Sequence, residues 1–546
     1  MRPAYPRLEP RREGAHGAAR KRYLLARMAG LDRRTLVALG AMAMAVLVIA
    51  NDFTAMSVAL PSIEDDFDID VSSVQWVINI YALVFGVMIV TGGRLADMFG
   101  RRRLFFIGAA IFAAFSVLGG AAQDDLWLIA CRAVMGVGGA MMWPAVLGMT
   151  FAILPDEKAG LAGGLVLGAA GFGNAAGPLL GGVLTEALSW RWILFVNLPI
   201  AVIAGLVTWR AVPESRADTG RERIDYAGIT TLAVGLMALL IALDQVTLWG
   251  WSDPRILGLL ALSVLSLGAF AVAERRAGSS ALVPGDVIGN AGFRSACIAT
   301  LLMSAVFFAV ILFLPQFFQK ILDYGALESG AALLPVMCLF ALSSFATGPL
   351  YNRFGAKTIV SAGAACLTVG TFLLSLVDRD SGWASLVPGM AVTGIGVGLF
   401  LSSITTAAVT ALDPARSSLA GGIIYMFQIA GGSIGLGLTT TVFTTASEDA
   451  LQADLAGTRL SGAEIDSLHG ALAGTDTANS LLARFPSATA DRLVELVREA
   501  FAAGMQWGFR LVALLALAGL IVSVLFVGGS LLGARGEPAA QPEASA

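Results

Sequence analysis

The sequence predicts an all-α integral membrane fold in which two related six-helix bundles are separated by two inserted helices. Three observations support this prediction. The chain of 546 residues is 57% hydrophobic and only 14% charged, and its mean hydropathy is +0.77. Apolar runs of about 20 residues, the length that crosses a bilayer as a helix, recur along the whole chain. A charged sequence that separates two of these runs is repeated in the second half of the chain.

Fourteen apolar segments are long enough to cross a bilayer, and each is expected to be a helix because lipid leaves no other partner for the backbone of a single segment. The connections between most of them are short and hold many of the charged residues. The expected spans are 35–60, 75–95, 104–122, 126–150, 160–186, 192–211, 227–246, 255–273, 294–318, 329–350, 358–377, 384–410, 418–444 and 507–530.

Positive charge marks alternate connections between the expected helices. The first 34 residues contain ten Lys and Arg, and the connection after the second helix contains Arg101–Arg103. The connections on the opposite side are acidic, as at 64–70 and at Asp124 and Asp125. Because cations favour the cytoplasmic side of a membrane, we expect both termini to be cytoplasmic. Residues 1–34 are then a basic cytoplasmic tail, and 531–546 a second tail.

One short sequence occurs twice. Residues 93–102 read Gly-Arg-Leu-Ala-Asp-Met-Phe-Gly-Arg-Arg, and residues 348–357 read Gly-Pro-Leu-Tyr-Asn-Arg-Phe-Gly-Ala-Lys, at a constant offset of 255. Both copies separate two apolar segments. Two related membrane halves are typical of secondary transporters, so the repeat predicts that architecture.

The offset also indicates how the halves are joined. A six-helix half needs roughly 190 residues at about 20 per span plus short connections, which leaves room for two more helices. A second repeat agrees, since 161–164 recurs as 419–422. We therefore predict a first bundle at 35–211, two inserted helices within 212–280, and a second bundle at 281–530.

The longest connection, 446–506, is expected to be extracellular. Within it, residues 491–503 predict a short amphipathic helix with Leu493, Leu496, Val497 and Ala500 on one face. A cap on the membrane surface is the favoured interpretation of this helix, because amphipathic helices commonly lie at that interface. A lid over a binding site is the alternative.

The motifs together resemble a known family. Residues 93–102 resemble the loop between helices 2 and 3 of the major facilitator superfamily, and 132–139 resemble its helix-4 motif. Residues 173–182 are similar to the helix-5 motif associated with antiporters. Residues 60–61 and 190–199 resemble the drug:proton antiporters of this superfamily that have fourteen helices. The resemblance covers roughly residues 35 to 530.

This resemblance implies two mobile elements. The first is a gate hinge formed by Gly93, Asp97, Gly100 and Arg101, in which Asp97 pairs with a cation or a helix N-terminus in one state and loses that partner in the other. The second is a bend in the fifth helix that seals against leakage, formed by Gly173, Gly177, Pro178 and Gly181. The alternative interpretations are anchoring by positive charge for the arginines of the hinge, and tight helix packing for the glycines. The second copy of the hinge departs from the pattern, with Asn352 where the first has Asp97.

Two ionisable residues lie deep in expected helices. Asp52 lies eight residues before Leu60, or about 12 Å from the end of the first helix, and Arg132 lies at a similar depth of about 10 Å in the fourth. A charge at such depth is costly unless it is paired, so it indicates function. We interpret Asp52 as the proton site and Arg132 as its partner, because a nearby cation and desolvation shift a carboxyl pKa in opposite directions. A carboxylate that faces substrate, and a purely structural pair, remain alternatives.

The candidate substrate cavity is predicted from apolar and polarisable side chains. Thr54, Met303, Phe307 and Met426 are its candidate residues, although packing against lipid is an equal alternative for the aromatic and Met side chains. Asp244 and Glu186 lie near the outer ends of helices, where a charge can reach water, and we expect them to be structural.

Several classes of function are disfavoured. Both histidines, His16 and His469, lie outside the apolar segments, which argues against a membrane enzyme or a metal site that depends on histidine, and no cofactor is expected. No Gly-x-x-x-x-Gly-Lys-Ser/Thr sequence is present, so we expect transport to be driven by a gradient.

The sequence therefore predicts a proton-coupled antiporter that exports hydrophobic or amphipathic drugs across the bacterial cytoplasmic membrane. Its expected partners are the small substrate, protons and lipid, with no nucleic acid, and it is expected to be a monomer. The direction of transport rests on the resemblance. An exporter dedicated to a single natural product, and a membrane sensor that does not transport, are the alternatives.

Overall fold

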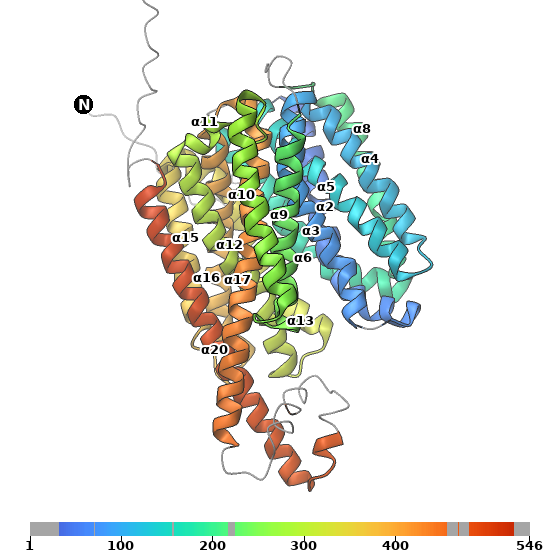
Figure 1. The fold of residues 1–546 in the computed structure, drawn as a ribbon, viewed down its shortest axis with the longest axis vertical. Helices are drawn as coiled ribbons and strands as arrows, with labels where there is room; N and C mark the ends of the chain where they lie inside the picture. Colours follow the sequence, from blue (N-terminus) through green and yellow to red (C-terminus); the bar gives the residue numbers. More distant parts are fainter. Residues whose placement is uncertain are drawn as a thin grey trace, which may run out of the picture.

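The computed structural model describes residues 32–69, 71–155, 158–216, 224–455, 468 and 480–528, which are mostly helical (Figure 1). Fourteen helices in this part of the chain are long and apolar enough to cross a bilayer. The protein is therefore a multi-pass membrane protein, and the predicted number of spans is confirmed. The predicted C-terminal tail and nearly all of the predicted basic tail lie outside the described residues.

The first bundle is built from six spans that pack around α2 and α5. Asp32 and Asp124 begin two of them, since their side chains accept hydrogen bonds from the backbone N–H groups of Thr35 and Trp127. The helices are α2 (Arg33–Phe67), α3 (Val71–Phe99), α4 (Arg101–Gly120), α5 (Asp125–Ile153), α6 (Ala159–Ala187), α7 (Arg191–Phe195) and α8 (Asn197–Ala211), and α7 and α8 together make the sixth span.

Two inserted helices follow, α9 (Tyr226–Trp249) and α10 (Pro254–Ala277). They pack against each other, and α9 also contacts α3 of the first bundle and α17 of the second. Most of α10 faces outward, and Val264 and Leu265 are more than two-thirds exposed. Such exposure of apolar side chains suits contact with lipid. Only α9 is therefore positioned to influence the interface between the two bundles.

The second bundle repeats the arrangement of the first, with α12, α16 and α17 near its centre. Asn290 begins α12 by accepting a hydrogen bond from the backbone N–H of Phe293. The helices are α11 (Gly285–Gly289), α12 (Ala291–Lys320), α13 (Ala326–Ala332), α14 (Leu334–Phe354), α15 (Ala356–Leu374), α16 (Trp383–Thr410), α17 (Ser417–Asp454) and α20 (Ser487–Phe526).

The prediction of a long connection at 446–506 is partly wrong. The helix α17 continues to Asp454 and α20 already begins at Ser487, so both project beyond the bundle (Figure 1). The predicted amphipathic helix at 491–503 is helical but is the first part of α20. Its apolar side chains Leu493 and Val497 pack with Leu451, Leu455, Leu468 and Leu481. The apolar face is thus covered by protein, which contradicts the expected cap on the membrane surface.

We call the paired extensions of α17 and α20 the helical hairpin. Ion pairs tie it to two neighbouring connections of the second bundle. Arg498 pairs with Asp323 at 2.8 Å, beside the end of α12, and Arg379, after α15, pairs with Glu499. The hairpin is therefore held against the second bundle.

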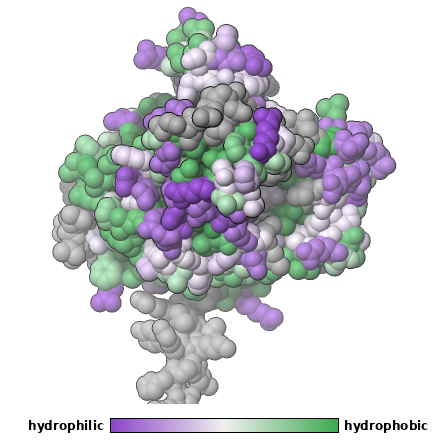
Figure 2. Space-filling view, turned by 90° about the horizontal axis from the view of Figure 1, so that it is seen from below, coloured by the Kyte–Doolittle hydropathy of each residue, from purple (hydrophilic) through white to green (hydrophobic). Residues whose placement is uncertain are grey.

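The two ends of the bundle differ in charge. We call the end where α2 begins and where α3 meets α4 the basic end, since it carries Arg101–Arg103. The acidic end lies opposite, where α2 ends beside Glu64–Asp66 and the helical hairpin projects. Hydrophilic side chains gather on the face seen from this end (Figure 2).

The repeated sequence forms the same backbone structure twice. Gly100 ends α3 with φ of 110°, and Gly355 ends α14 with φ of 82°. Side chains disfavour this left-handed region, which explains why glycine occupies both positions. Each glycine directly precedes the next helix, so the repeat predicted from sequence is confirmed as a tight helix-to-helix corner.

Candidate functional site

Asp52 of α2 and Arg132 of α5 form an ion pair in the interior of the first bundle. Both side chains are fully buried, and Arg132 Nη1 donates a hydrogen bond of 2.5 Å to Asp52 Oδ2. Arg132 Nε donates to the carbonyl oxygen of Val77 in α3 at 2.9 Å. The structure therefore brings Asp52 and Arg132 together, as predicted from their similar depth in the membrane. Removing one partner of such a buried pair would leave an uncompensated charge in the bundle interior.

Two further residues of this site had no predicted role. Asn197 Nδ2, at the start of α8, donates to Asp52 Oδ1 at 2.8 Å and to Ser116 Oγ at 3.1 Å. Ser116 Oγ in turn donates to the carbonyl oxygen of Leu194 at 2.7 Å. Both carboxylate oxygens of Asp52 thus have a donor. The signal available in the sequence was a polar Asn197 within an apolar span.

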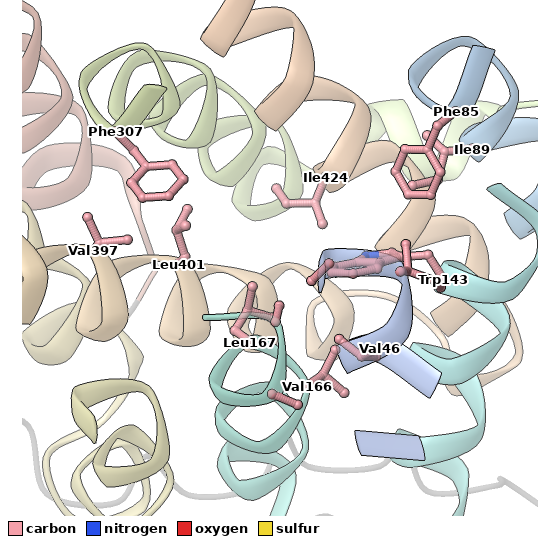
Figure 3. Close-up of a cluster of buried hydrophobic side chains, with 14 of the residues drawn as sticks. Val46, Phe85, Ile89, Trp143, Val166, Leu167, Phe307, Val397, Leu401 and Ile424 are labelled. Atoms are coloured by element: carbon pink, nitrogen blue, oxygen red, sulfur yellow. The ribbon is translucent and has the colours of Figure 1, made fainter. Parts of the chain in front are cut away.

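A cavity of about 210 Å³ lies between the two bundles. Its walls come from α2, α3, α5 and α6 on one side and from α12, α14 and α17 on the other. Seven of the nineteen described residues in its wall are aromatic. Figure 3 shows a cluster of buried side chains that includes two of these aromatic residues, Phe85 and Trp143 of the first bundle, near Ile424 of the second, with Phe307 also in view. Trp143 and Tyr425 are in ring contact across the interface at 4.5 Å between centroids. Such a wall suits an apolar or aromatic ligand.

Two of the four predicted cavity residues line this space, and two do not. Thr54 and Phe307 are in the wall. Met303 is buried against α20, where its side chain lies in contact distance of Gly519. Met426 follows Tyr425, which does line the cavity, and consecutive residues of a helix point about 100° apart. The placement of Met303 and Met426 in the wall was wrong because the sequence does not fix the rotation of each helix.

Tyr81 connects the ion pair to the cavity. Tyr81 lines the cavity, and the guanidinium carbon of Arg132 lies 4.4 Å from the centroid of the Tyr81 ring. Ala50 and Thr54 of α2 also line the cavity, whereas Asp52 is on the opposite side of that helix and does not. In this conformation the carboxylate therefore lies behind the cavity wall, which does not favour the alternative in which it contacts substrate.

Asp97 joins the two bundles at the basic end. Its carboxylate accepts hydrogen bonds from the backbone N–H groups of Leu419 at 2.8 Å and Ser418 at 3.3 Å, in the first turn of α17. It also accepts from Arg101 Nε at 2.9 Å. A carboxylate at a helix N-terminus is stabilised by the free N–H groups and the helix dipole. Asp97 therefore has both kinds of partner expected of a latch, a cation and a helix N-terminus.

Arg101 and Gly93 complete this contact. Arg101 Nη2 donates to the carbonyl oxygens of Pro414 at 2.8 Å and Ala415 at 3.2 Å, just before α17. A Cβ atom at Gly93 would lie 2.6 Å from the carbonyl oxygen of Ser418, so only glycine fits. Two of the four hinge residues, Gly93 and Asp97, thus bring α3 into contact with α17, and Arg101 of α4 holds the residues just before α17. Gly100 instead shapes the corner described above.

Glu214 caps the same corner and was missed from sequence. Its carboxylate accepts hydrogen bonds from the backbone N–H groups of Arg102 and Arg103, each at 3.0 Å. This cap neutralises the N-terminus of α4 in the first bundle. Glu214 lies in the connection after α8, where nothing in the sequence links it to the hinge.

The glycines of α6 face α2 at close range. A Cβ atom at Gly173 would lie 2.8 Å from the carbonyl oxygen of Leu47, and one at Gly177 would lie 2.9 Å from Thr54 Cβ. Gly181 meets the backbone of Ala55 one turn further on, and Pro178 lies within the helix. Tight packing of the glycines is thus present, while sealing by a bend at Pro178 stays a prediction.

Fourteen spans, two repeated bundles and a cavity between them define the fold of a secondary transporter. The protein belongs to the Major Facilitator Superfamily, whose family model matches residues 42–436.

Several relatives are similar over most of their length. The puromycin resistance protein pur8 of Streptomyces alboniger is 36% identical over 74% of this chain and 80% of its own. The tetracenomycin C resistance and export protein of Streptomyces glaucescens is 28% identical over 91% of this chain and 92% of its own. The multidrug transporter protein MdtP of Bacillus subtilis is 29% identical over 77% of both chains.

A solved structure supports the fold independently. The human organic anion transporter MFSD10 (TETRAN) superposes with a TM-score of 0.60, covering 90% of this chain and 100% of its own. The two sequences are only 12% identical, so this likeness concerns the fold alone.

Proposed function

We propose that the protein exports hydrophobic or amphipathic drugs across the bacterial cytoplasmic membrane in exchange for protons. The observation that carries this proposal is that a fully buried Asp52–Arg132 pair lies one side chain, Tyr81, away from an aromatic cavity. The names of the relatives support drug export, since they include antibiotic resistance and multidrug transport proteins. The protein is proposed to act as a monomer, because both bundles that form the cavity come from one chain.

Protonation of Asp52 supplies the coupling in this proposal. A neutral Asp52 attracts Arg132 much less strongly, so the guanidinium group is free to shift against Tyr81 in the cavity wall. A substrate that presses on Tyr81 from the cavity acts on the same contact from the other side. Substrate and proton thus both act on the contact between Arg132 and Tyr81. Coupled exchange requires such a shared element, whose equilibrium both ligands shift.

The latch at Asp97 controls access from one side. We propose that the basic end, and with it both termini, is cytoplasmic, in line with its positive charge. The contacts of Asp97 and Arg101 with α17 then close the cavity toward the cytoplasm in this conformation. Breaking them would let the bundles rock apart at that end and admit substrate.

The test is transport by inside-out vesicles that contain the purified protein. Wild-type vesicles with an imposed proton gradient should accumulate a fluorescent lipophilic drug and release protons in step. Asp52→Asn should abolish this accumulation while retaining drug-for-drug exchange without a gradient, because the cavity is intact. Asp323→Asn, which alters a carboxylate whose side chain is 66% exposed, is the matched control and should behave as wild type. Full gradient-driven accumulation by Asp52→Asn would sink the proposal.

A narrower function is the second candidate. Some relatives are named for a single natural product, as in the tetracenomycin C resistance and export protein and the cephamycin export protein CmcT of Amycolatopsis lactamdurans. Both candidates use the same coupling site. A panel of unrelated drugs distinguishes them, since a dedicated exporter would respond to only one chemical scaffold.

A further inference from the structure

Among the described residues, the wall of the central cavity offers a substrate no carboxylate and no cationic side chain. Nineteen described residues line it, and none is Asp, Glu, Lys, Arg or His. Its polar side-chain groups are the amides of Asn174 and Gln428, the indole N–H of Trp143, and the hydroxyl groups of Thr54, Ser433 and two tyrosines. The cavity by itself therefore offers an apolar substrate a suitable wall, but gives a cationic substrate no counter-charge.

A smaller pocket adjoins this cavity on the side of the inserted helices. It has a volume of about 140 Å³ and shares Ala82, Ile429 and Ser433 with the wall of the central cavity. Its other residues come from α3, α9 and α17, and they include Asp244 of α9. We call it the side pocket. Its volume corresponds to roughly four or five water molecules at about 30 Å³ each, enough for a small head group.

Asp244 is positioned within the membrane span. It lies five residues before the end of α9 at Trp249, or about 8 Å from that end. Asn79 Nδ2 of α3 donates to its two oxygens at 3.0 Å and 3.2 Å, and Gln245 Nε2 donates at 2.8 Å. These amide groups orient the carboxylate, which forms part of the wall of the side pocket. From the sequence we expected Asp244 to be a structural charge near a helix end. The pocket that it lines was not predicted.

We infer that Asp244 is an anionic subsite that binds the positive group of cationic amphipathic substrates, while their apolar part occupies the central cavity. This inference rests on the proposed function as a drug exporter. Neutral substrates would use the aromatic cavity alone. The inserted helix α9 thereby contributes to the choice of substrate, although it belongs to neither bundle.

The test compares two probes of similar shape that differ in charge. Tetraphenylphosphonium carries a permanent positive charge, and triphenylphosphine oxide is neutral. Equilibrium binding to the purified full chain is measured for wild type, Asp244→Asn and Asp244→Glu. Glu186→Gln is the matched control, because it neutralises an exposed carboxylate at the same end of the bundle that lines neither pocket.

Asp244→Asn should weaken binding of tetraphenylphosphonium roughly tenfold or more, as expected when one member of a desolvated charge pair is lost. Binding of triphenylphosphine oxide should change less than twofold, and Asp244→Glu should retain most of the affinity for the cation. An equal loss for both probes would mean that Asp244 only clamps α9 to α3, and it would overturn the inference. So would unchanged affinity for the cation in Asp244→Asn.

Transport separates this inference from the proposed function. A wild-type protein that binds the cation through Asp244 but moves no drug with a proton gradient would refute proton-coupled export and leave the subsite in place. Loss of gradient-driven transport of the neutral probe in Asp244→Asn, with its binding intact, would instead identify Asp244 as a second proton site and overturn the inference.

Discussion

The two bundles share a backbone plan but differ in where they bury charge. Among the described residues, the first bundle buries the charged side chains of Asp52, Arg94, Asp97, Arg101 and Arg132. In the described part of the second bundle, the buried polar side chains are uncharged and belong mainly to Ser and Thr. Rocking requires both bundles, whereas a response to protons requires an ionisable group. The difference teaches that a shared backbone plan does not require a shared charge pattern, and under the proposed function it assigns coupling to the first bundle.

The two hinge copies show this difference on a smaller scale. Asp97 is 1% exposed and receives N–H groups from α17 of the other bundle. Asn352, its counterpart, is exposed beside Gly160 in the first turn of α6. The first hinge therefore lies against α17, which carries residues 419–422 of the second repeat. The second hinge lies against α6, which carries the matching residues 161–164. Asp97 contributes a charge to its contact, whereas the side chain of Asn352 is a neutral amide.

Breaking the ion pair of the first bundle should have the largest effect. Arg132→Met leaves Asp52 buried without its counter-ion and should lower the free energy of unfolding by about 3–5 kcal/mol. In the second bundle, Thr406→Val removes a buried hydrogen bond to Ser402 and should cost about 1 kcal/mol. Thermal unfolding of the purified proteins in one detergent measures the difference.

The double variant Asp52→Leu with Arg132→Met is the control for this prediction. It should regain most of the lost stability, since no unpaired charge is left in the bundle, but it should not regain proton-coupled transport. Equal stability of Arg132→Met and wild type would show that the pair is not held as two ions.

Exchanging the two hinge residues should have the next largest effect. Asp97→Asn weakens the charged hydrogen bonds to α17 and Arg101, and should favour separation of the bundles at the basic end by about 1.5–3 kcal/mol. Asn352→Asp places a charge near the N-terminus of α6 and should stabilise the closed end by only about 0.3–1 kcal/mol. Distances between spin labels on the two bundles report the populations. The prediction requires that Asp97→Asn raises the population that is open at the basic end and that Asn352→Asp lowers it.

Adding a methyl group at each hinge should sharpen the comparison of packing. Gly93→Ala forces a Cβ against the carbonyl oxygen of Ser418 and should destabilise the closed basic end by about 1–3 kcal/mol. A Cβ atom added at Gly348 would have Leu161 Cα as its nearest neighbour, at 3.0 Å. Gly348→Ala should therefore destabilise the closed basic end less than Gly93→Ala does. The rate at which a thiol reagent modifies Ser418→Cys, with the four native cysteines replaced, measures the opening. A faster reaction in Gly348→Ala than in Gly93→Ala would contradict the expected order.

The smallest effect is expected at the helical hairpin. Arg498→Ala removes an exposed ion pair with Asp323 and should change the stability by about 0.2–1 kcal/mol or less, because exposed pairs gain little in water. Transport should be unchanged. A large loss of drug export in this variant would show that the second bundle depends on charge after all.

The fourteen spans, the two bundles and the depth of Asp52 and Arg132 could be predicted because hydropathy and rise per residue fix them. The rotation of each helix could not, and Met303 accordingly faces α20 instead of the cavity. Contacts between distant segments were also hidden, as with Asn197 on Asp52 and Glu214 on α4. The helical hairpin was missed because Leu493 and Leu451 cover each other only after α17 and α20 are paired.

The length of the helical hairpin has a practical consequence for imaging. The helices α17 and α20 contain 38 and 40 residues, or about 57 Å and 60 Å at 1.5 Å per residue, while the hydrocarbon core is about 30 Å thick. Small transporters usually lack features outside the detergent belt by which single particles can be aligned. Here the hairpin is a natural fiducial, and an antibody fragment raised against it would mark the orientation of the second bundle without touching the cavity.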